Sequence, residues 1–308
     1  MEPDYVARCL QLAVLLEVSA YPKPGNVHRA RDFSDTRYEH FLASAVALYP
    51  HFREAARRGV ECLEGTRGLS DVGVGEIVRR CVEDMLGWQR GGNTHLGTIL
   101  LLAPMAVAAG MTAAESFSPA TLRRNLTLVV KSTTPRDAVM VYNAISAVNP
   151  GGLGRAPKFD VRDESSRREI LEKGITLYEI FEIASSYDSV AYEWVSGYRI
   201  TFDVGYPFLV KELEKTGDVN VAVVNTFLRV MAEVPDTLIA RKFGAERARE
   251  VSLMARHALE KGGLATKEGR CIVYELDDAL HSAGLNPGTT ADLVCSCLSV
   301  LTLGGYRP

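Results

Sequence analysis

The stretch RGGNTHLGTILLLAPMAVAAG, residues 90–110, sets the class of the fold. Apolar residues follow His95 almost without interruption, more densely than one face of a surface helix would need. A segment that is apolar nearly all round predicts a buried helix at the centre of a helical protein. Three polar side chains, Asn93, Thr94 and His95, stand at its start, where either a helix cap or half of a ligand site would explain them.

The rest of the chain repeats the helical pattern. Apolar residues recur at helical spacing almost everywhere, and the strict alternation typical of strands is nearly absent. We expect helices at about 6–15, 37–59, 74–89, from 93, from 118, at 133–148, 165–185, 189–196, 201–215, 218–235, 245–262, 266–284 and from 289 or 290 to 303. These patterns predict an all-α fold, a bundle of about a dozen helices in one catalytic domain over residues 1–308. The loop at 149–163 is its weakest point.

Composition excludes several classes of function. With 35 basic and 38 acidic residues among 308, the chain carries a formal charge of −3 and lacks the positive field of a nucleic-acid or anionic-membrane binder. The longest apolar run, 99–109, is too short to cross a bilayer. No targeting signal opens the chain, and the six cysteines form no CxxC pair. We therefore expect a cytoplasmic protein with buried thiols and no zinc site; the sequence leaves a homodimer open.

Four polar segments are richer in glycine and in hydrogen-bonding side chains than helix connections require. The first is YPKPGNVHRARDF at 21–33, and the second is the start of the central helix at 90–95. The third is VPDTLIARKFG at 234–244, and the fourth is LNPGTTADLV at 285–294. The residues in them that offer phosphate, metal or proton chemistry are Lys23, Asn26, His28, Arg29, Asp32, Asn93, Thr94, His95, Asp236, Arg241, Gly288, Thr289 and Asp292.

Each segment also has an ordinary structural explanation. The first could be an exposed loop with solvated charges, and His95 could be a core histidine. Asp236 and Arg241 are spaced for a local salt bridge, although the carboxylate could instead hold Mg²⁺ while the arginine faces a phosphate. Thr289 and Asp292 are spaced like a capping box, yet they open a second apolar helix whose amides could bind a polyanion. The residues alone predict an all-α enzyme with an anion-binding site formed by loops and helix N-termini.

The order of these motifs resembles a known family. PKPGNVHR, GGNTHLG, PDTLIARK and NPGTTADL follow one another within about residues 10–303, whereas the P-loop, GxSxG and HExxH signatures are absent. In this order on a helical chain they resemble the triphosphoribosyl-dephospho-CoA synthases, which make the precursor of the citrate lyase or malonate decarboxylase prosthetic group. The resemblance implies a transferase that moves the 5-triphosphoribosyl group of ATP onto the ribose 2′-hydroxyl of 3′-dephospho-CoA and releases adenine.

The resemblance also implies roles for the motif residues. ATP is the expected substrate, a CoA-like or other nucleotide-like molecule the expected acceptor, and Mg²⁺ the expected ion on the triphosphate. We expect Asp236 and Asp292 to bind Mg²⁺ or to stabilise an oxocarbenium-like centre, with Asp32 as a further metal ligand. His28 or His95 is expected to move the proton, because histidine titrates near neutral pH. The expected substrate and phosphate ligands are Lys23, Asn26, Arg29, Asn93, Thr94, Arg241, Gly288 and Thr289.

Three of the motifs depart from the family pattern. The lysine of the family's NTHKG is Leu96 here, DTN reads DTL at 236–238, and SPGGSAD reads NPGTTAD at 286–292. These changes leave open a second function: a related ribosyl transferase, or an enzyme that cleaves the N-glycosidic bond of another nucleotide-like substrate. A nucleotide-binding protein without catalysis is a third alternative, which so many carboxylates and imidazoles in polar loops disfavour.

Overall fold

The protein folds as a bundle of helices, and the part of the chain that the structure describes contains no β-strand. The structure is a computed structural model that describes residues 1–151, 153–154, 156 and 158–308. The fifteen α-helices in these residues are α1 (Pro3–Ser19), α2 (Tyr38–Leu63), α3 (Val74–Trp88), α4 (Leu96–Gly110), α5 (Pro119–Lys131), α6 (Pro135–Val148), α7 (Glu164–Lys173), α8 (Leu177–Ala184), α9 (Ser189–Ser196), α10 (Tyr206–Thr216), α11 (Val219–Glu233), α12 (Thr237–Phe243), α13 (Ala245–Glu260), α14 (Lys267–Ser282) and α15 (Gly288–Leu303). The all-α prediction is confirmed.

The predicted helices differ from the observed ones in three places. The segment expected as one helix at 165–185 is two, because Gly174 has a φ of +68° and ends α7. The short helix α12 was not predicted as a separate element, and the segment expected at 201–215 begins with a π-helical turn, Ile200–Gly205. Three residues of the predicted loop at 149–163, at positions 152, 155 and 157, lie outside the described residues.

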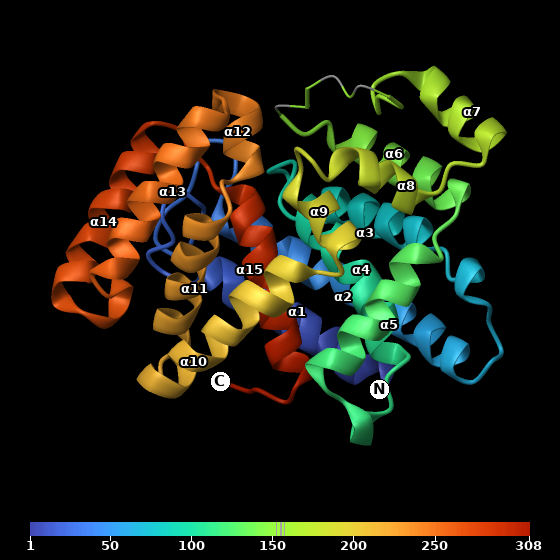
Figure 1. The fold of residues 1–308 in the computed structure, drawn as a ribbon, viewed down its shortest axis with the longest axis horizontal. Helices are drawn as coiled ribbons and strands as arrows, with labels where there is room; N and C mark the ends of the chain where they lie inside the picture. Colours follow the sequence, from blue (N-terminus) through green and yellow to red (C-terminus); the bar gives the residue numbers. More distant parts are fainter. Residues whose placement is uncertain (152, 155, 157) are drawn as a thin grey trace.

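The helices α4 and α15 form the centre of the fold. Figure 1 shows α15 running through the middle of the molecule, with α11–α14 on one side and α5–α8 on the other. Helix α15 packs against α1, α4, α10 and α11, and α4 packs against α2 and α5. The prediction of a buried central helix after residue 93 is confirmed, and among the described residues no helix is long and apolar enough to cross a membrane.

Pro104 lies inside α4 and shapes how that helix is held. Proline has no backbone N–H, so the carbonyl of Leu100 four residues earlier loses its helical partner. The indole N–H of Trp194 donates to that carbonyl at 3.0 Å. One residue further on, the Tyr198 hydroxyl donates to the Leu101 carbonyl at 3.0 Å. Two buried aromatic side chains therefore satisfy the backbone of α4 and fasten α9 and the turn after it to the centre.

Glycines allow α2 and α4 to cross closely. A Cβ atom on Gly59 would stand 2.0 Å from the Val107 carbonyl oxygen, and one on Gly110 would stand 2.1 Å from the Ala56 carbonyl oxygen. Both contacts are with backbone atoms, which cannot swing away as a side chain can. The close approach of these two helices therefore depends on glycine at both positions.

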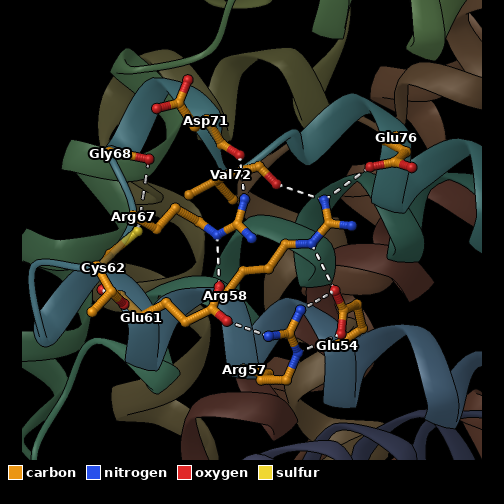
Figure 2. Close-up of polar contacts among 11 residues, drawn as sticks. Glu54, Arg57, Arg58, Glu61, Cys62, Arg67, Gly68, Asp71, Val72 and Glu76 are labelled. Carbon is orange, nitrogen blue, oxygen red and sulfur yellow. Dashed lines mark hydrogen bonds and ion pairs between the residues drawn. The ribbon is translucent and has the colours of Figure 1, made fainter.

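A network of charged residues holds the connection between α2 and α3 (Figure 2). Arg58 is buried, and its Nε donates to Glu54 at 2.9 Å while Nη1 donates to the Val72 carbonyl at 2.7 Å and to Glu76 at 3.0 Å. Arg57 beside it pairs with Glu54 and Glu61 on the exposed face of the helix. Arg58 therefore joins two helices and a loop, whereas Arg57 joins residues of one helix.

We expect Arg58→Met to lower the free energy of unfolding by about 2–4 kcal/mol, because it leaves the buried Val72 carbonyl without its side-chain donor and removes the ion pairs that join α2 to α3. Arg57→Met, the matched change on the same helix, should cost less than about 1 kcal/mol, since exposed ion pairs contribute little. Denaturant unfolding of the two variants measures both values. Equal losses in the two variants would contradict the role given to Arg58.

Candidate active site at the start of the central helices

The polar residues at the start of α4 tie that helix to its surroundings. The Asn93 side-chain oxygen accepts the Leu96 amide, the first amide of α4, at 3.1 Å, while the N-cap residue His95 makes no side-chain cap bond. The Thr94 hydroxyl lies 2.7 Å from the Ser44 hydroxyl on α2. His95 is buried, and its Nε2–H donates to the Phe41 carbonyl at 3.3 Å. The sequence allowed either a helix cap or half of a ligand site here. Asn93 satisfies an amide at the start of α4, as a cap would, and Thr94 and His95 contact α2.

His95 is neutral at physiological pH. Burial lowers the pKa of His95 to about 4, because removal from water disfavours the charged ring. Its bond to a carbonyl requires the proton on Nε2, which leaves Nδ1 as the acceptor nitrogen. At pH 7 the ring therefore carries no proton on Nδ1 and cannot act as a general acid through that nitrogen.

Solvent reaches the two central helices near their N-terminal ends. Across residues 96–110 and 288–303, all of which the structure describes, every residue is buried except Gly288, the first residue of α15, and the pair Gly97 and Asp292. These two residues touch each other, since a Cβ atom built on Gly97 would stand 2.0 Å from Asp292 Oδ2. The contact lies in the first turn of α4 and near the start of α15, where unpaired backbone amides make the potential positive.

Asp292 is a titratable carboxyl group at this contact. Its Oδ1 accepts the Thr98 hydroxyl at 2.6 Å. The pKa of Asp292 is raised to about 7, because removal from water and the charges of Glu17 and Asp236 outweigh the hydrogen bonds from Thr98, which lower it. A carboxyl group with a pKa near 7 is present in both protonation states at neutral pH, as general acid–base chemistry requires.

Asp236 joins the third and fourth polar segments. Its Oδ1 accepts the amides of Leu238 and Ile239 at 2.9 and 3.0 Å, capping α12. Its Oδ2 accepts the Thr290 amide at 2.7 Å and the Thr290 hydroxyl at 2.8 Å, at the start of α15. The side chain is buried, and both oxygens are occupied by two donors each. In this arrangement Asp236 links two helix starts and has no free oxygen for a ligand.

Lys23, expected to hold phosphate, is instead inside the protein. The residue has an exposed fraction of 0%, and its ammonium group pairs with the Glu17 carboxylate and donates to the Glu17 carbonyl at 3.2 Å. Burial raises the pKa of Glu17. An ammonium group must either be paired or lose its charge when it is buried, and here the partner is a residue of α1 that the sequence patterns did not single out.

Asn26 and His28 fasten the first segment to the end of α14 and the loop after it. The Asn26 amide donates to the Asn286 side-chain oxygen at 2.8 Å. His28 is buried, its Nδ1 accepts the Ala30 amide at 3.2 Å, and its Nε2–H donates to Asp277 Oδ2 at 3.2 Å. Both ring nitrogens of His28 are thus engaged. Asp277 also accepts the Gly25 amide at 2.9 Å, so it is a buried anchor that sequence reasoning missed.

The remaining predicted ligands lie toward the surface. Arg29 is exposed, with its guanidinium 5.6 Å from the centre of the Tyr21 ring. Asp32 is exposed and accepts the Tyr38 amide at 2.7 Å, at the start of α2. Arg241 pairs with Asp188, and the local salt bridge expected between Arg241 and Asp236 is not formed.

Direct contacts connect the first, third and fourth polar segments and the helix that follows the second. Thr98 binds Asp292, joining the helix that follows the second segment to the fourth; Asp236 binds Thr290, joining the third to the fourth. Asn26 binds Asn286, joining the first to the fourth. The Thr237 and Thr289 hydroxyls lie 3.3 Å apart, which adds a second link between α12 and α15. The start of α15 and the loop before it therefore contact the first and third segments and the helix that follows the second.

The expected metal ligands do not form a preassembled site. Within the described residues, no group of three or more His, Cys, Asp or Glu side chains could hold a metal ion. Asp236 has both oxygens occupied, and Asp32 binds a backbone amide at the protein surface. Asp32 and Asp292 each have solvent-accessible surface and one carboxyl oxygen outside the hydrogen bonds described, but of these two only Asp292 lies on a central helix, against Gly97 of α4.

Fold and site place the protein in the class of all-α proteins with a partly exposed, titratable carboxyl group near the N-termini of two central helices. The model of the CitG family, described as ATP:dephospho-CoA triphosphoribosyl transferase, matches residues 3–307. The chain belongs to this family of transferases, as the resemblance of its four motifs predicted.

Named relatives agree with the family. The chain is 25% identical over 312 residues to the 2-(5″-triphosphoribosyl)-3′-dephosphocoenzyme-A synthase of Klebsiella pneumoniae, covering 100% of this chain and 94% of the relative. It is 27% identical over 297 residues to the probable enzyme of that name from Pseudomonas fluorescens, covering 93% and 87%. It is 25% identical to Protein CitXG of Leuconostoc mesenteroides over 95% of this chain, which spans 57% of that longer protein.

A solved structure has the same fold. The crystal structure of a protein from Archaeoglobus fulgidus, provisionally assigned as a triphosphoribosyl-dephospho-CoA synthase, matches with a TM-score of 0.65 and 27% identity. The match covers 86% of this chain and 100% of the other. The helical arrangement is thus shared with a solved member of this group.

Proposed function

We propose that this chain transfers the 5-triphosphoribosyl group of ATP to the ribose 2′-hydroxyl of 3′-dephospho-CoA, releasing adenine, and that residues 1–308 form one catalytic domain. The observation that carries the proposal is the contact of Gly97 with Asp292, where solvent reaches a titratable carboxyl group between two helix starts. Membership in the transferase family supports the choice of substrates. The positive ends of the helices suit a triphosphate.

The proposed reaction forms one bond and breaks another. The hydroxyl oxygen of the acceptor attacks the anomeric carbon of the ATP ribose while the bond from that carbon to adenine breaks. The hydroxyl gives up a proton and adenine takes one, so a positioned acid–base group lowers the barrier. Positive charge builds up on the sugar ring as the base departs, and a nearby carboxylate stabilises that charge.

We assign the proton acceptor to Asp292. Its Oδ2 faces Gly97 at the accessible contact, while Oδ1 is held by Thr98. His28 is less suited to the role because both of its ring nitrogens already have partners. His95 is less suited as an acid because its pKa is lowered to about 4. We therefore assign to Asp292 the proton transfer that the sequence analysis expected of His28 or His95.

Backbone amides at the start of α15 are the proposed phosphate ligands. This helix begins at Gly288, and its N-cap residue, Pro287, provides no side-chain cap. The amides of Gly288 and Thr289 lie in the first turn, so the proposed site places the triphosphate of ATP against them. We propose Arg29 and Arg241 as further phosphate contacts, at the outer end of the triphosphate. Lys23 is not included, because it is buried against Glu17.

The described residues do not fit a resident Mg²⁺, because the three predicted carboxylates do not converge as a ligand set. Mg²⁺ in enzymes that handle nucleotides is commonly held by substrate phosphates with one or two carboxylates. We therefore propose that Mg²⁺ arrives on the triphosphate of ATP, and no step above depends on a protein-bound ion. A homodimer also stays a proposal.

Adenine release tests the proposed function. The protein is incubated with ATP and Mg²⁺, with and without 3′-dephospho-CoA, and free adenine and the triphosphoribosylated product are measured by chromatography. We expect both products in equal amounts, and only when the acceptor is present. Adenine released only with other nucleotide-like acceptors would support the related transferase instead, and ATP binding without adenine release would indicate a binding protein.

A further inference from the structure

We infer that Gly97 is a positioning residue of the candidate site: its missing side chain makes the space in which the Asp292 carboxylate stands and keeps Oδ2 open to a substrate hydroxyl. The inference rests on the proposed function only for the identity of that hydroxyl. The space itself follows from the packing of α4 against α15.

The geometry at Gly97 leaves no room for a methyl group. A Cβ atom there would stand 2.0 Å from Asp292 Oδ2, 2.6 Å from its Cγ and 3.2 Å from Oδ1. The whole carboxylate, and no other side chain or backbone group among the three nearest atoms, fills the position that a side chain at residue 97 would take. Atoms at such distances cannot coexist, so one of the two residues would have to move.

Backbone conformation does not explain this glycine. Gly97 is absent from the residues with positive φ, and it lies within the continuous helix α4. Glycine inside a helix is less favourable than alanine because it loses more conformational freedom on folding. A residue that weakens the helix without serving a turn therefore needs another reason, and the Asp292 carboxylate provides it.

Two neighbouring residues of α4 fix the position of the Asp292 carboxylate, one at each oxygen. Thr98 holds Oδ1 through a bond of 2.6 Å, and Gly97 provides the gap beside Oδ2. A methyl group at residue 97 would push the carboxylate off Thr98, removing a hydrogen bond that lowers the pKa of Asp292. The expected consequence is a more weakly held carboxylate that gains its charge only at higher pH.

A thermal double-mutant cycle tests the contact without reference to activity. Gly97→Ala in the wild-type chain should lower Tm by about 2–6 °C, as expected for an overpacked core position. In an Asp292→Ala background the same change should leave Tm unchanged or raise it, because the clashing carboxylate is gone and alanine favours the helix. An equal fall in both backgrounds would overturn the inference.

Two other glycines serve as controls. Gly87 in α3 has nothing within 4 Å of a built Cβ, so Gly87→Ala should not lower Tm. Gly59 faces a backbone carbonyl 2.0 Å from its Cβ position, so Gly59→Ala should lower Tm in both backgrounds. These controls separate a clash with the Asp292 side chain from a general effect of alanine.

A pH profile distinguishes positioning from simple destabilisation. The rise of kcat/KM with pH should shift to higher pH in Gly97→Ala and stay unshifted in Gly59→Ala, measured as adenine release below both melting temperatures. A Gly97→Ala profile that coincides with wild type would overturn the inference. A wild-type protein that releases no adenine would refute the proposed function and leave the thermal cycle as an independent test.

Discussion

Asp292→Asn is expected to lower kcat for adenine release about a thousandfold, since a positioned acid–base group typically contributes 10²- to 10⁴-fold. Asparagine has the size of aspartate, and its side-chain oxygen can still accept the Thr98 hydroxyl, so the packing against Gly97 is retained. The amide cannot take a proton from the acceptor hydroxyl. We therefore expect the loss in turnover with a Tm equal to or above that of the wild type.

The pH dependence of the wild-type reaction also tests the assignment of Asp292 as the proton acceptor. If the ionised form of Asp292 accepts the proton, kcat/KM should rise with pH up to about 7, where its pKa lies, and then level off. This limb should vanish in Asp292→Asn. Asp278→Asn, at an exposed carboxylate on α14, is the matched control and should keep the wild-type rate and profile. An Asp292→Asn enzyme with more than a tenth of the wild-type kcat would exclude Asp292 as the proton acceptor.

The helical fold could be predicted because most helices bury an apolar face and start at a capping residue. The cap expected at Ser118 accepts the Thr121 amide, and Asp218 caps α11 as expected. The predictions failed where local signals were weak. Helix α12 has only seven residues, too few for a periodic pattern, and the break at Gly174 lies inside a stretch that keeps its apolar spacing.

The sequence predicted the polar segments of the candidate site, but not the residues that pair with their charged side chains. The sequence patterns predicted four polar segments and included Asp292 among their functional residues, but they left open whether the segments meet in space. Glu17 and Asp277 were missed because each is a single carboxylate in an amphipathic helix, and only the fold shows that one pairs with Lys23 and the other with His28. Gly97 and Thr98 carried one available signal, a glycine and a hydroxyl inside an otherwise apolar helix.

Asp236→Ala is expected to lower the free energy of unfolding by about 3–5 kcal/mol, from the loss of a helix cap and of acceptors for buried donors. The carboxylate accepts two amides of α12 and both the amide and the hydroxyl of Thr290, so all four donors lose their partner. Asp236→Asn should cost less, because its oxygen can keep the cap of α12 and its NH₂ group can donate to the Thr290 hydroxyl oxygen, so that only the Thr290 amide loses its acceptor.

Equilibrium unfolding in denaturant measures this loss, and Thr290→Val is the matched control. That change removes the hydroxyl donor and leaves the Thr290 amide bonded, so it should cost about 1 kcal/mol. The sequence patterns made Asp236 a metal ligand or a catalytic group, for which a stable but inactive variant is expected. Asp236→Ala with wild-type stability and no turnover would restore that role, whereas a large loss of stability identifies Asp236 as the link that holds the start of α12 against α15 and so keeps the Asp292 helix in place.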